Sequence, residues 1–343
     1  MWRARGPKLL LLCWLLFAAV SALAPRPAFA AEKVSVAALP FVSSAPIFIA
    51  QSRGFFAAEG LEVELRFFQA AQPVALAVAS GDLDFGVTGL TAGFYNLAGR
   101  GALTILGGQA RVEPGDEFIA YVAGAKAWSA GLRSLDALPG HAVGITQTGS
   151  TFHYMVGRLA DKRGFALDQI KLVTLESVPN VIAALRGGSI DAALLPGHLA
   201  GPLVDQGIAK LLGWAGDETP WQLGAVFTTP RTLSRRAPTV DAFLRAYRRG
   251  AAMYDDVLRP VRAGAKPTPE VGAKARALAE ELHRFVPSSI DEILASAPMI
   301  DRDGRLEIAD VRDQVAWYQR HGLVDKSVEV DSFLSPQARD LAP

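Results

Sequence analysis

Cysteine is almost absent from this chain of 343 residues. The only one, Cys13, lies in an N-terminal segment that we expect to be removed, and the preceding Leu11 and Leu12 are not the small pair of a lipoprotein site. The mature chain therefore cannot form disulfides, use a cysteine nucleophile or build a cysteine-ligated metal site. A chain without thiols suits an oxidising compartment such as the periplasm.

The N-terminal segment has the pattern of a secretory signal. Three basic side chains precede an unbroken apolar run over residues 9–20, and Ala28 and Ala30 supply a small-x-small cleavage site. The run is too short to span a bilayer comfortably. We therefore predict that residues 1–30 are a cleaved signal peptide and that the protein is periplasmic.

Neither sign of charge dominates, and no basic run stands out. The leader holds four of the 35 basic side chains and no acid, which leaves 31 basic against 34 acidic groups and a formal charge of −3. Nucleic acid is therefore not an expected partner.

Catalytic patterns are also scarce. The five histidines show no H-E-x-x-H spacing, and neither a G-x-S-x-G elbow nor a G-x-G-x-x-G or Walker A loop occurs. We expect no enzyme activity, no catalytic residue, no cofactor and no metal.

What the chain does contain is a pattern that occurs twice. Residues 75–89 and 183–197 each run from an apolar helix ended by Gly into an aliphatic–Asp pair, a short buried strand and a final Gly. Asp84 and Asp191 occupy the same place in the two copies, which favours a structural role for both acids. A repeated helix–turn–strand unit predicts two similar α/β lobes with a ligand cleft between them.

Short strands and helices alternate along most of the chain, which predicts an α/β fold with two doubly wound lobes and largely parallel sheets. We expect residues 31–122 and 223–343 to form lobe I with C-terminal helices, and residues 123–222 to form lobe II. The expected strands are 33–39, 61–67, 83–87, 103–106, 118–122, 141–146, 170–175, 191–195, 209–214 and 223–229.

In open α/β sheets, ligands bind beyond the carboxyl ends of strands, where loops meet helix N-termini. Four such loops are rich in Gly, Ser and Thr or end in His, although helix capping, a plain turn or core packing would also explain them. Arg111 follows a strand end and is the best lone cation for a carboxylate or sulfonate, unless it is simply an exposed loop residue. The other predicted ligand-binding residues are Phe41, Ser43, Ser44, Thr88, Gly89, Thr148, Gly149, Ser150, Thr151, His153 and His198.

The chain also resembles a known family. Residues 45–63 are similar to the "A-P-x-x-x-A-x-x-x-G-[FY]-F-x-x-E-G-L-x-V" opening of the ABC-importer substrate-binding proteins for sulfonate, nitrate, taurine and thiamine-pyrimidine precursors. Residues 79–86 and 188–192 resemble its "G-x-x-D-x-[GA]" element, and residues 135–150 its "L-x-x-L-x-G-K-x-[IV]-[GA]" and following "G-S/T" loop. The resemblance implies a type II periplasmic binding fold with a two-segment hinge, and it places Phe41, Thr88 and the loop 148–151 near the ligand.

Two departures from the family pattern leave the ligand open. Residues 195–198 read Leu-Pro-Gly-His where many sulfonate binders have a bulkier aromatic-Asp-Pro element, and His141 replaces the usual Lys. We expect a monomeric binding protein that captures a small solute, favouring an anion such as a sulfonate, nitrate or organic carboxylate. It would deliver this solute to an ABC permease and its ATPase. The alternatives are a neutral heterocycle such as a thiamine pyrimidine precursor or a flavin, an enzyme on the same scaffold, and a sensor domain.

Overall fold

The computed structural model describes residues 31–262 and 266–340. The predicted signal peptide, residues 1–30, lies outside the described residues. Contacts group the chain from Glu32 onward into one compact unit. None of the helices in the two described ranges has the length and apolar character that a membrane crossing requires.

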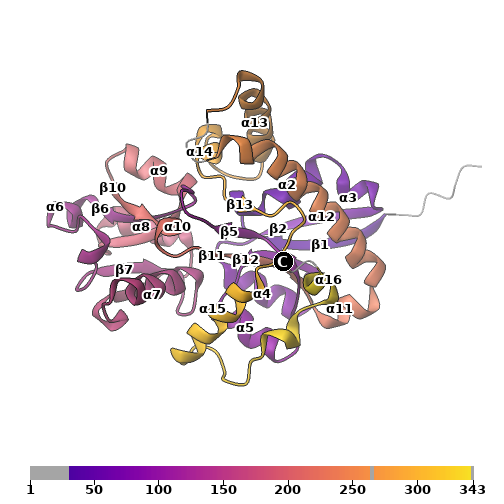
Figure 1. Ribbon diagram of the computed structural model, residues 1–343, viewed down its shortest axis with the longest axis horizontal. Helices are drawn as coiled ribbons and strands as arrows, with labels where there is room; N and C mark the ends of the chain where they lie inside the picture. Colours follow the sequence, from indigo (N-terminus) through magenta and orange to yellow (C-terminus); the bar gives the residue numbers. More distant parts are fainter. Residues whose placement is uncertain (1–30, 263–265, 341–343) are drawn as a thin grey trace, which may run out of the picture. The chain divides into compact units, whose positions relative to one another are not determined.

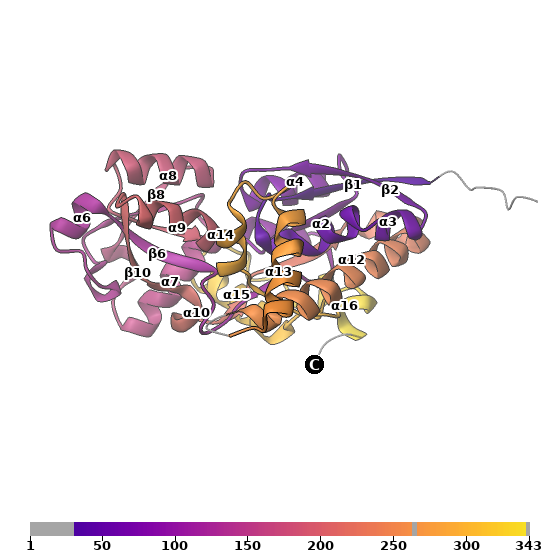
Figure 2. The same cartoon turned by 90° about the horizontal axis from the view of Figure 1, so that it is seen from above.

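The first sheet has the strand order β2-β1-β3-β12-β4. β1 pairs in parallel with β2 and β3, whereas β12 is antiparallel to both β3 and β4. Figure 2 shows α2, α3 and α12 on one face of this sheet and α4 on the other. The bounds are β1 Glu32–Ala38, β2 Leu61–Phe67, β3 Phe85–Gly89, β4 Thr104–Gly108, β12 Gly224–Thr228, α2 Ala45–Ser52, α3 Phe55–Ala58, α4 Ala71–Ala79, α5 Ala92–Gly99, α11 Pro230–Arg235 and α12 Ala237–Leu258.

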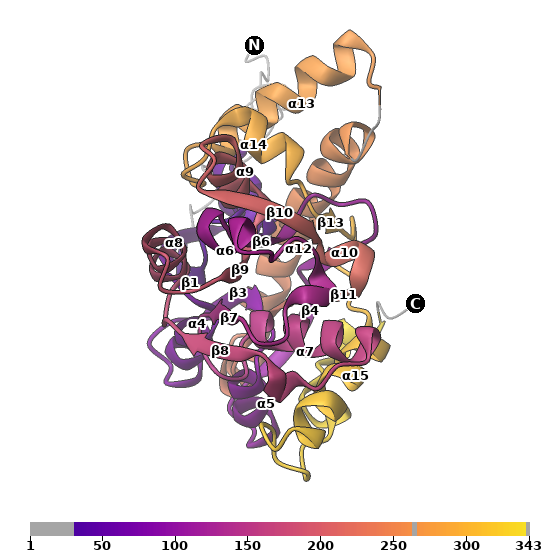
Figure 3. The ribbon, with the colours of Figure 1, turned by 90° about the vertical axis from the view of Figure 1, so that its left-hand side faces the viewer.

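The second sheet has the order β10-β6-β9-β7-β8, which can be followed from top to bottom in Figure 3. β7 is parallel to β8 and β9, whereas β6 is antiparallel to β9 and β10. The bounds are β6 Ile119–Gly124, β7 Ala142–Ile145, β8 Lys171–Thr174, β9 Ala192–Pro196, β10 Ala209–Trp214, α6 Ala125–Ser129, α7 Thr151–Arg163, α8 Val178–Gly187, α9 Gly197–Asp205 and α10 Ala215–Glu218.

The sheets are mixed rather than largely parallel. β6 is the first strand of the second sheet along the chain, and β12 is the strand with which the chain returns to the first sheet. Each of these two strands therefore enters its sheet from the side of the other large sheet. Each is antiparallel to both of the strands with which it pairs. The other strands of each sheet share one direction, β1 to β4 in the first sheet and β7 to β10 in the second.

A small third sheet lies on the path between the two large ones. Its order is β11-β5-β13, with β5 Ala110–Val112, β11 Trp221–Gln222 and β13 Met299–Ile300. β5 precedes β6 and β11 precedes β12, so both passages of the chain between the large sheets run through this small sheet. The hinge that the family resemblance implies would fall here, and hinge motion remains a prediction.

The C-terminal helices cover both large sheets. In α15, Gln314 accepts a hydrogen bond from Tyr95 Oη of α5 at 2.8 Å, and Trp317 Nε1 donates to Asp161 Oδ2 of α7 at 3.0 Å. α15 therefore links a helix of the first sheet to a helix of the second (Figure 1). The bounds of these elements are α13 Pro269–Leu282, α14 Ile290–Ala295, α15 Ile308–Arg320 and α16 Pro336–Asp340.

The repeated aspartates have the same structural task in the two large sheets. Asp84 Oδ2 accepts hydrogen bonds from the N–H of Ser35 at 2.8 Å and from its hydroxyl at 3.0 Å. Asp191 Oδ2 accepts from the N–H of Ala142 at 2.9 Å. Each acid thus bonds a residue of a neighbouring strand that lies 49 residues earlier in the chain. Asp84 also pairs with Arg236 at the start of α12.

Replacing Asp84 by Ala should destabilise the fold by about 1–3 kcal/mol, because it leaves the N–H of Ser35 and the guanidinium of Arg236 without their partner. Asp82→Ala is the matched control, since Asp82 is exposed and bonds only the hydroxyl of the nearby Ser80. Urea unfolding of the two variants measures the difference. Equal midpoints would contradict the structural role of Asp84.

Candidate functional site

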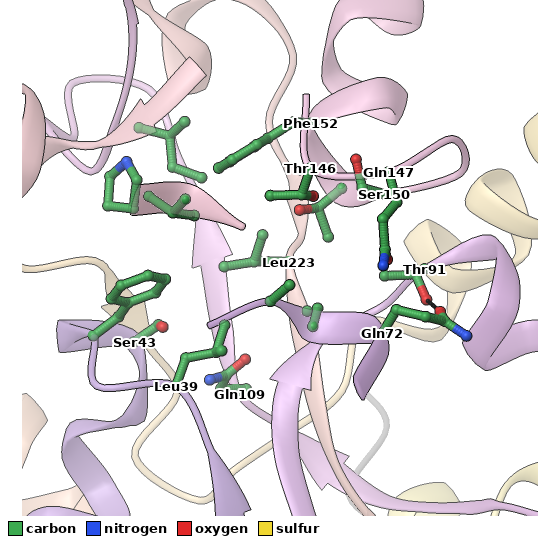
Figure 4. Close-up of a pocket in the computed structure, with 18 of the residues that line it drawn as sticks. Leu39, Ser43, Gln72, Thr91, Gln109, Thr146, Gln147, Ser150, Phe152 and Leu223 are labelled. Carbon is green, nitrogen blue, oxygen red and sulfur yellow. Dashed lines mark hydrogen bonds between the residues drawn. The ribbon is translucent and has the colours of Figure 1, made fainter. Parts of the chain in front are cut away.

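A cavity of about 60 Å³ lies between the first and second sheets. That volume has room for roughly four to six water-sized groups. Figure 4 shows Leu39, Ser43 and Gln109 on one side and Thr146, Ser150 and Phe152 on the other. The residues that line it are Leu39, Phe41, Ser43, Ala70, Ala71, Gln72, Gly89, Thr91, Gln109, Phe118, Ile119, Thr146, Gln147, Ser150, Thr151, Phe152, Val178, Pro196 and Leu223.

No side chain in this lining is ionisable at neutral pH. The polar groups are hydroxyls and carboxamides, and the rest of the wall is aliphatic or aromatic. A charged ligand group in this cavity would therefore be held by neutral donors and helix ends rather than by a counter-charge.

The N-terminus of α7 forms one wall of the cavity. The Ser150 hydroxyl caps the helix by accepting from the N–H of His153 at 3.3 Å. The N–H groups of Thr151 and Phe152 have no hydrogen-bond partner among the described residues. Free N–H groups at the positive end of a helix dipole attract hydrogen-bond acceptors, above all anions.

The N-terminus of α4 lies in another wall and has no side-chain cap. Its N-cap residue is Ala70, which cannot accept a hydrogen bond from the first turn as Ser or Asp would. The neighbouring Gln72 is held at one end, because its Oε1 accepts from the hydroxyl of Thr91 at 2.7 Å (Figure 4). A second helix end with unused donors thus meets the same cavity.

Several buried polar groups beside the cavity lack partners. Oγ of Ser44, Oγ1 of Thr88 and Oε1 of Gln109 are inaccessible and make no hydrogen bond within the described residues. The hydroxyl of Thr146 lines the cavity and makes no hydrogen bond to another described residue either. Unpaired buried polar groups are costly, so their concentration here points to a ligand or ordered water in the cavity.

The walls from the two sheets meet at glycines. The N–H of Ala92, at the start of α5, donates to the carbonyl of Gly149 at 2.8 Å. A Cβ on Gly149 would lie 2.7 Å from the Ala92 methyl, and a Cβ on Gly89 would lie 2.7 Å from the Thr151 methyl. Both glycines were predicted as ligand-binding residues, and the close approach seen here is that of the two walls to each other.

His153 supports the loop before α7 from within. Its Nδ1 accepts the N–H of Gly149 at 2.9 Å, and its ring contacts Trp317 edge-on. Burial, with a smaller contribution from the charge of His321, lowers the pKa of His153 to about 4. The imidazole is therefore neutral near pH 7 and able to accept that hydrogen bond.

The structure brings five of the predicted ligand-binding residues into the lining: Phe41, Ser43, Gly89, Ser150 and Thr151. The other predicted residues lie outside it. Ser44, Thr88, Gly149, His153 and His198 are buried beside the cavity, and Thr148 is exposed. Ligand contact by any of these residues stays a prediction.

Arg111 lies on β5, outside the cavity lining. Its guanidinium bonds Glu113 Oε1 at 2.6 Å and Asp310 Oδ2 at 2.9 Å. Both partners are acidic, so this positive charge is already matched within the protein. It gives the cavity no free cation.

Sequence reasoning did not select several polar lining residues. Gln109 follows β4, Thr146 and Gln147 follow β7, and Gln72 lies in the first turn of α4. Their common signal is position: each stands at a strand end or a helix start on the cavity side. Among the described residues, no cluster of three or more His, Cys, Asp or Glu side chains could hold a metal ion.

Comparison with known proteins identifies the family and the fold. A model of the NMT1-like family matches residues 28–219, a little over half of the chain. Among curated proteins, none matches. The resemblance stated from the sequence is thus confirmed, as is the α/β fold of periplasmic binding proteins.

Three solved structures illustrate this likeness. The MOPS-bound alkanesulfonate-binding protein SsuA from Xanthomonas axonopodis pv. citri has a TM-score of 0.69 at 19% identity, covering 91% of this chain and 99% of that one. The periplasmic nitrate-binding protein NrtA from Synechocystis PCC 6803 has a TM-score of 0.70 at 13% identity, covering 90% and 88%. A variant of DszB in complex with biphenyl-2-sulfinic acid has a TM-score of 0.58 at 12% identity, covering 90% and 98%; DszB is an enzyme. At these identities the likeness shows the fold alone.

Gly149→Ala should weaken the contact between the two cavity walls, because the new methyl would lie against that of Ala92 in a backbone conformation with φ of +78°. Gly164→Ala is a close control, with φ of +75° at the other end of α7 and nothing within 4 Å. Urea unfolding should show Gly149→Ala to be less stable than this control by about 1–3 kcal/mol. Equal stability of the two variants would mean that the wall contact is unimportant.

Acidification should destabilise the protein through His153. The pKa of His153 is about 4 in the folded chain, whereas an ordinary histidine has a pKa of 6.5. As pH falls from 6.5 to 4, the unfolded chain therefore takes up the proton before the folded chain does. Stability is thus lost by about 1.4 kcal/mol per pH unit in that window. Gln in place of His153 keeps a hydrogen-bond acceptor but does not titrate. Between pH 7 and 4.5, the free energy of unfolding should therefore fall by about 2 kcal/mol less in His153→Gln than in the wild type. Equal falls in the free energy of unfolding for the variant and the wild type over this pH range would contradict this role of His153.

Proposed function

Because the chain belongs to the NMT1-like family and has the periplasmic-binding-protein fold, we propose that it is the exported solute-binding component of an ABC importer. In this proposal, lobe I (residues 31–122 and 223–343) and lobe II (residues 123–222) close on a small solute. The closed complex then delivers the solute to a membrane permease driven by an ATPase. Export by the signal peptide over residues 1–30 is part of the proposal.

The single observation that carries the proposal is the cavity between the two sheets, with unused hydrogen-bond donors in both walls. Thr151 and Phe152 present free N–H groups from α7, and the uncapped start of α4 faces the same space. Such donors favour a solute whose head group is rich in acceptors, such as a sulfonate, nitrate or carboxylate. Ligands that contact both walls stabilise the closed state, which couples binding to closure.

A neutral head group is the second candidate for the same site. The absence of any ionisable side chain from the lining supports it, because a neutral heterocycle needs no counter-charge. The small volume of the cavity favours a compact solute over a flavin. Catalysis is not proposed, although the enzyme DszB shares the fold.

A thermal-shift screen with sulfonates, nitrate, carboxylates and pyrimidines tests the proposal first. A solute at a hundred times its dissociation constant should stabilise the protein by about 2.7 kcal/mol and be recovered unchanged. Stabilisation by no compound in any of these classes, or consumption of the compound that stabilises, would count against a solute-binding protein.

Thr146→Val then tests the site itself. The substitution is isosteric and breaks no hydrogen bond within the described residues, so the fold should be unaffected while solute affinity falls by roughly tenfold. Thr148→Val is the matched control, because Thr148 is exposed in the same loop and lies outside the lining. Calorimetric titration with the best solute of the screen measures both. An equal loss of solute affinity in the two variants, or no loss in Thr146→Val, would show that the solute does not bind at Thr146.

A further inference from the structure

His198 is a buried imidazole that has no hydrogen-bond partner in the part of the chain that the structure describes. It lies at the start of α9, directly after Pro196, which lines the cavity. Its side chain is 1% exposed, and neither Nδ1 nor Nε2 bonds any described residue. A neutral imidazole has one N–H donor and one nitrogen acceptor, and in His198 neither of them bonds a described residue.

The imidazole lies directly behind one end of the cavity. Its ring centre is 5.5 Å from that of Phe41, which belongs to the other wall and lines the cavity. Phe41 and Pro196 thus line the cavity and lie next to His198, in space and in sequence respectively. Phe41 is half-buried, and a rotation of its ring is the movement that would open His198 to the cavity.

Two hydroxyls near this end of the cavity make no hydrogen bond to another described residue. Ser43 lines the cavity, and Ser44 is fully buried with an unbonded Oγ. Neither serine caps the helix α2 with its side chain. In Figure 4, Ser43 lies across the cavity from Gln147 and Ser150 at the start of α7. The cavity therefore has polar groups at both ends.

The two ends differ in what they can bind. The α7 end offers N–H donors and suits an acceptor-rich head group. At the other end, burial lowers the pKa of His198 to about 3, so the imidazole stays neutral and has no positive charge for an anion. It can instead exchange hydrogen bonds with a group that both donates and accepts, as a hydroxyl or a primary amide does.

From this geometry we propose that His198 is a specificity-determining residue that selects solutes with a neutral polar tail. The solute places its head group at the N-terminus of α7, and its hydroxyl or amide tail turns Phe41 aside to reach His198 and Ser44. The inference rests on the proposed function, since it concerns the same cavity. It names the solute class more narrowly: a short chain with an acceptor-rich head and a hydroxyl or amide at the far end.

Isosteric pairs of solutes test this proposal. 2-Hydroxyethanesulfonate and propane-1-sulfonate differ only by a hydroxyl in place of a methyl, and 3-hydroxypropanoate and butanoate form the same pair with a carboxylate head. Calorimetric titration of the wild type should give at least a roughly tenfold preference for the hydroxyl member of one pair. Equal affinities within both pairs, or a preference for the methyl members, would overturn the proposal.

His198→Leu assigns the preference to the imidazole. In this variant the ratio of affinities within the preferred pair should fall to near one, while the methyl compound keeps its affinity within about twofold. His321→Leu is the control, because His321 is exposed and stacks on Trp317 away from the cavity. If the wild-type ratio of affinities persists in His198→Leu, the proposal is overturned. Should this variant fail to fold, His198→Gln is titrated in its place.

Failure of this proposal can be told apart from failure of the proposed function. If nitrate or ethanesulfonate stabilises the protein but no hydroxyl compound binds, the tail selection is wrong and the solute-binding function stands. If no compound of the screen binds at all, both fall together.

Discussion

Two backbone hydrogen bonds join the cavity walls: the longer runs from the N–H of Val178 to the carbonyl of Gln69 at 3.4 Å, and the shorter from the N–H of Ala92 to the carbonyl of Gly149 at 2.8 Å. It joins the start of α5, on the first sheet, to the loop that opens α7, on the second. The bond is possible only because Gly149 has no Cβ to meet Ala92. The same loop is held from behind by His153, so the free N–H groups of α7 are directed at the cavity by contacts from both walls.

Electrostatics divides the molecule in a consistent way. Two arginines that lie outside the cavity are paired with acids, Arg111 with Asp310 and Arg236 with Asp84. The cavity is lined by neutral groups only. The proposed solute recognition would therefore rest on hydrogen-bond donors, helix ends and shape, because no charged side chain lines the cavity.

The fold was largely readable from the sequence, because it is specified by local patterns. The alternation over residues 61–67 predicted β2 with its observed bounds, and the repeated Asp turn predicted two related sheets tied by Asp84 and Asp191. The mixed direction of the sheets was not readable. It depends on which strands β6 and β12 pair with after the chain crosses between the sheets. That pairing is decided by tertiary contacts, and no pattern of neighbouring residues in the sequence indicates it.

The site was readable only in part. Loops at strand ends gave Ser43, Ser150 and Thr151, since hydroxyls and glycines at helix starts carry a recognisable pattern. Gln109 and Thr146 carry no such pattern, because a single carboxamide or hydroxyl at a strand end is common in any α/β protein. Whether Arg111 faces a ligand or an acid depends on α15, about two hundred residues later in the chain.

Small-angle X-ray scattering with and without a saturating solute tests the central claim, that two lobes close on a small molecule, most directly. The account predicts a more expanded solute-free protein and a fall in the radius of gyration on binding, to the value calculated for the closed arrangement of residues 32–340. An unchanged scattering curve at a solute concentration that calorimetry shows to be saturating would contradict closure as the basis of binding.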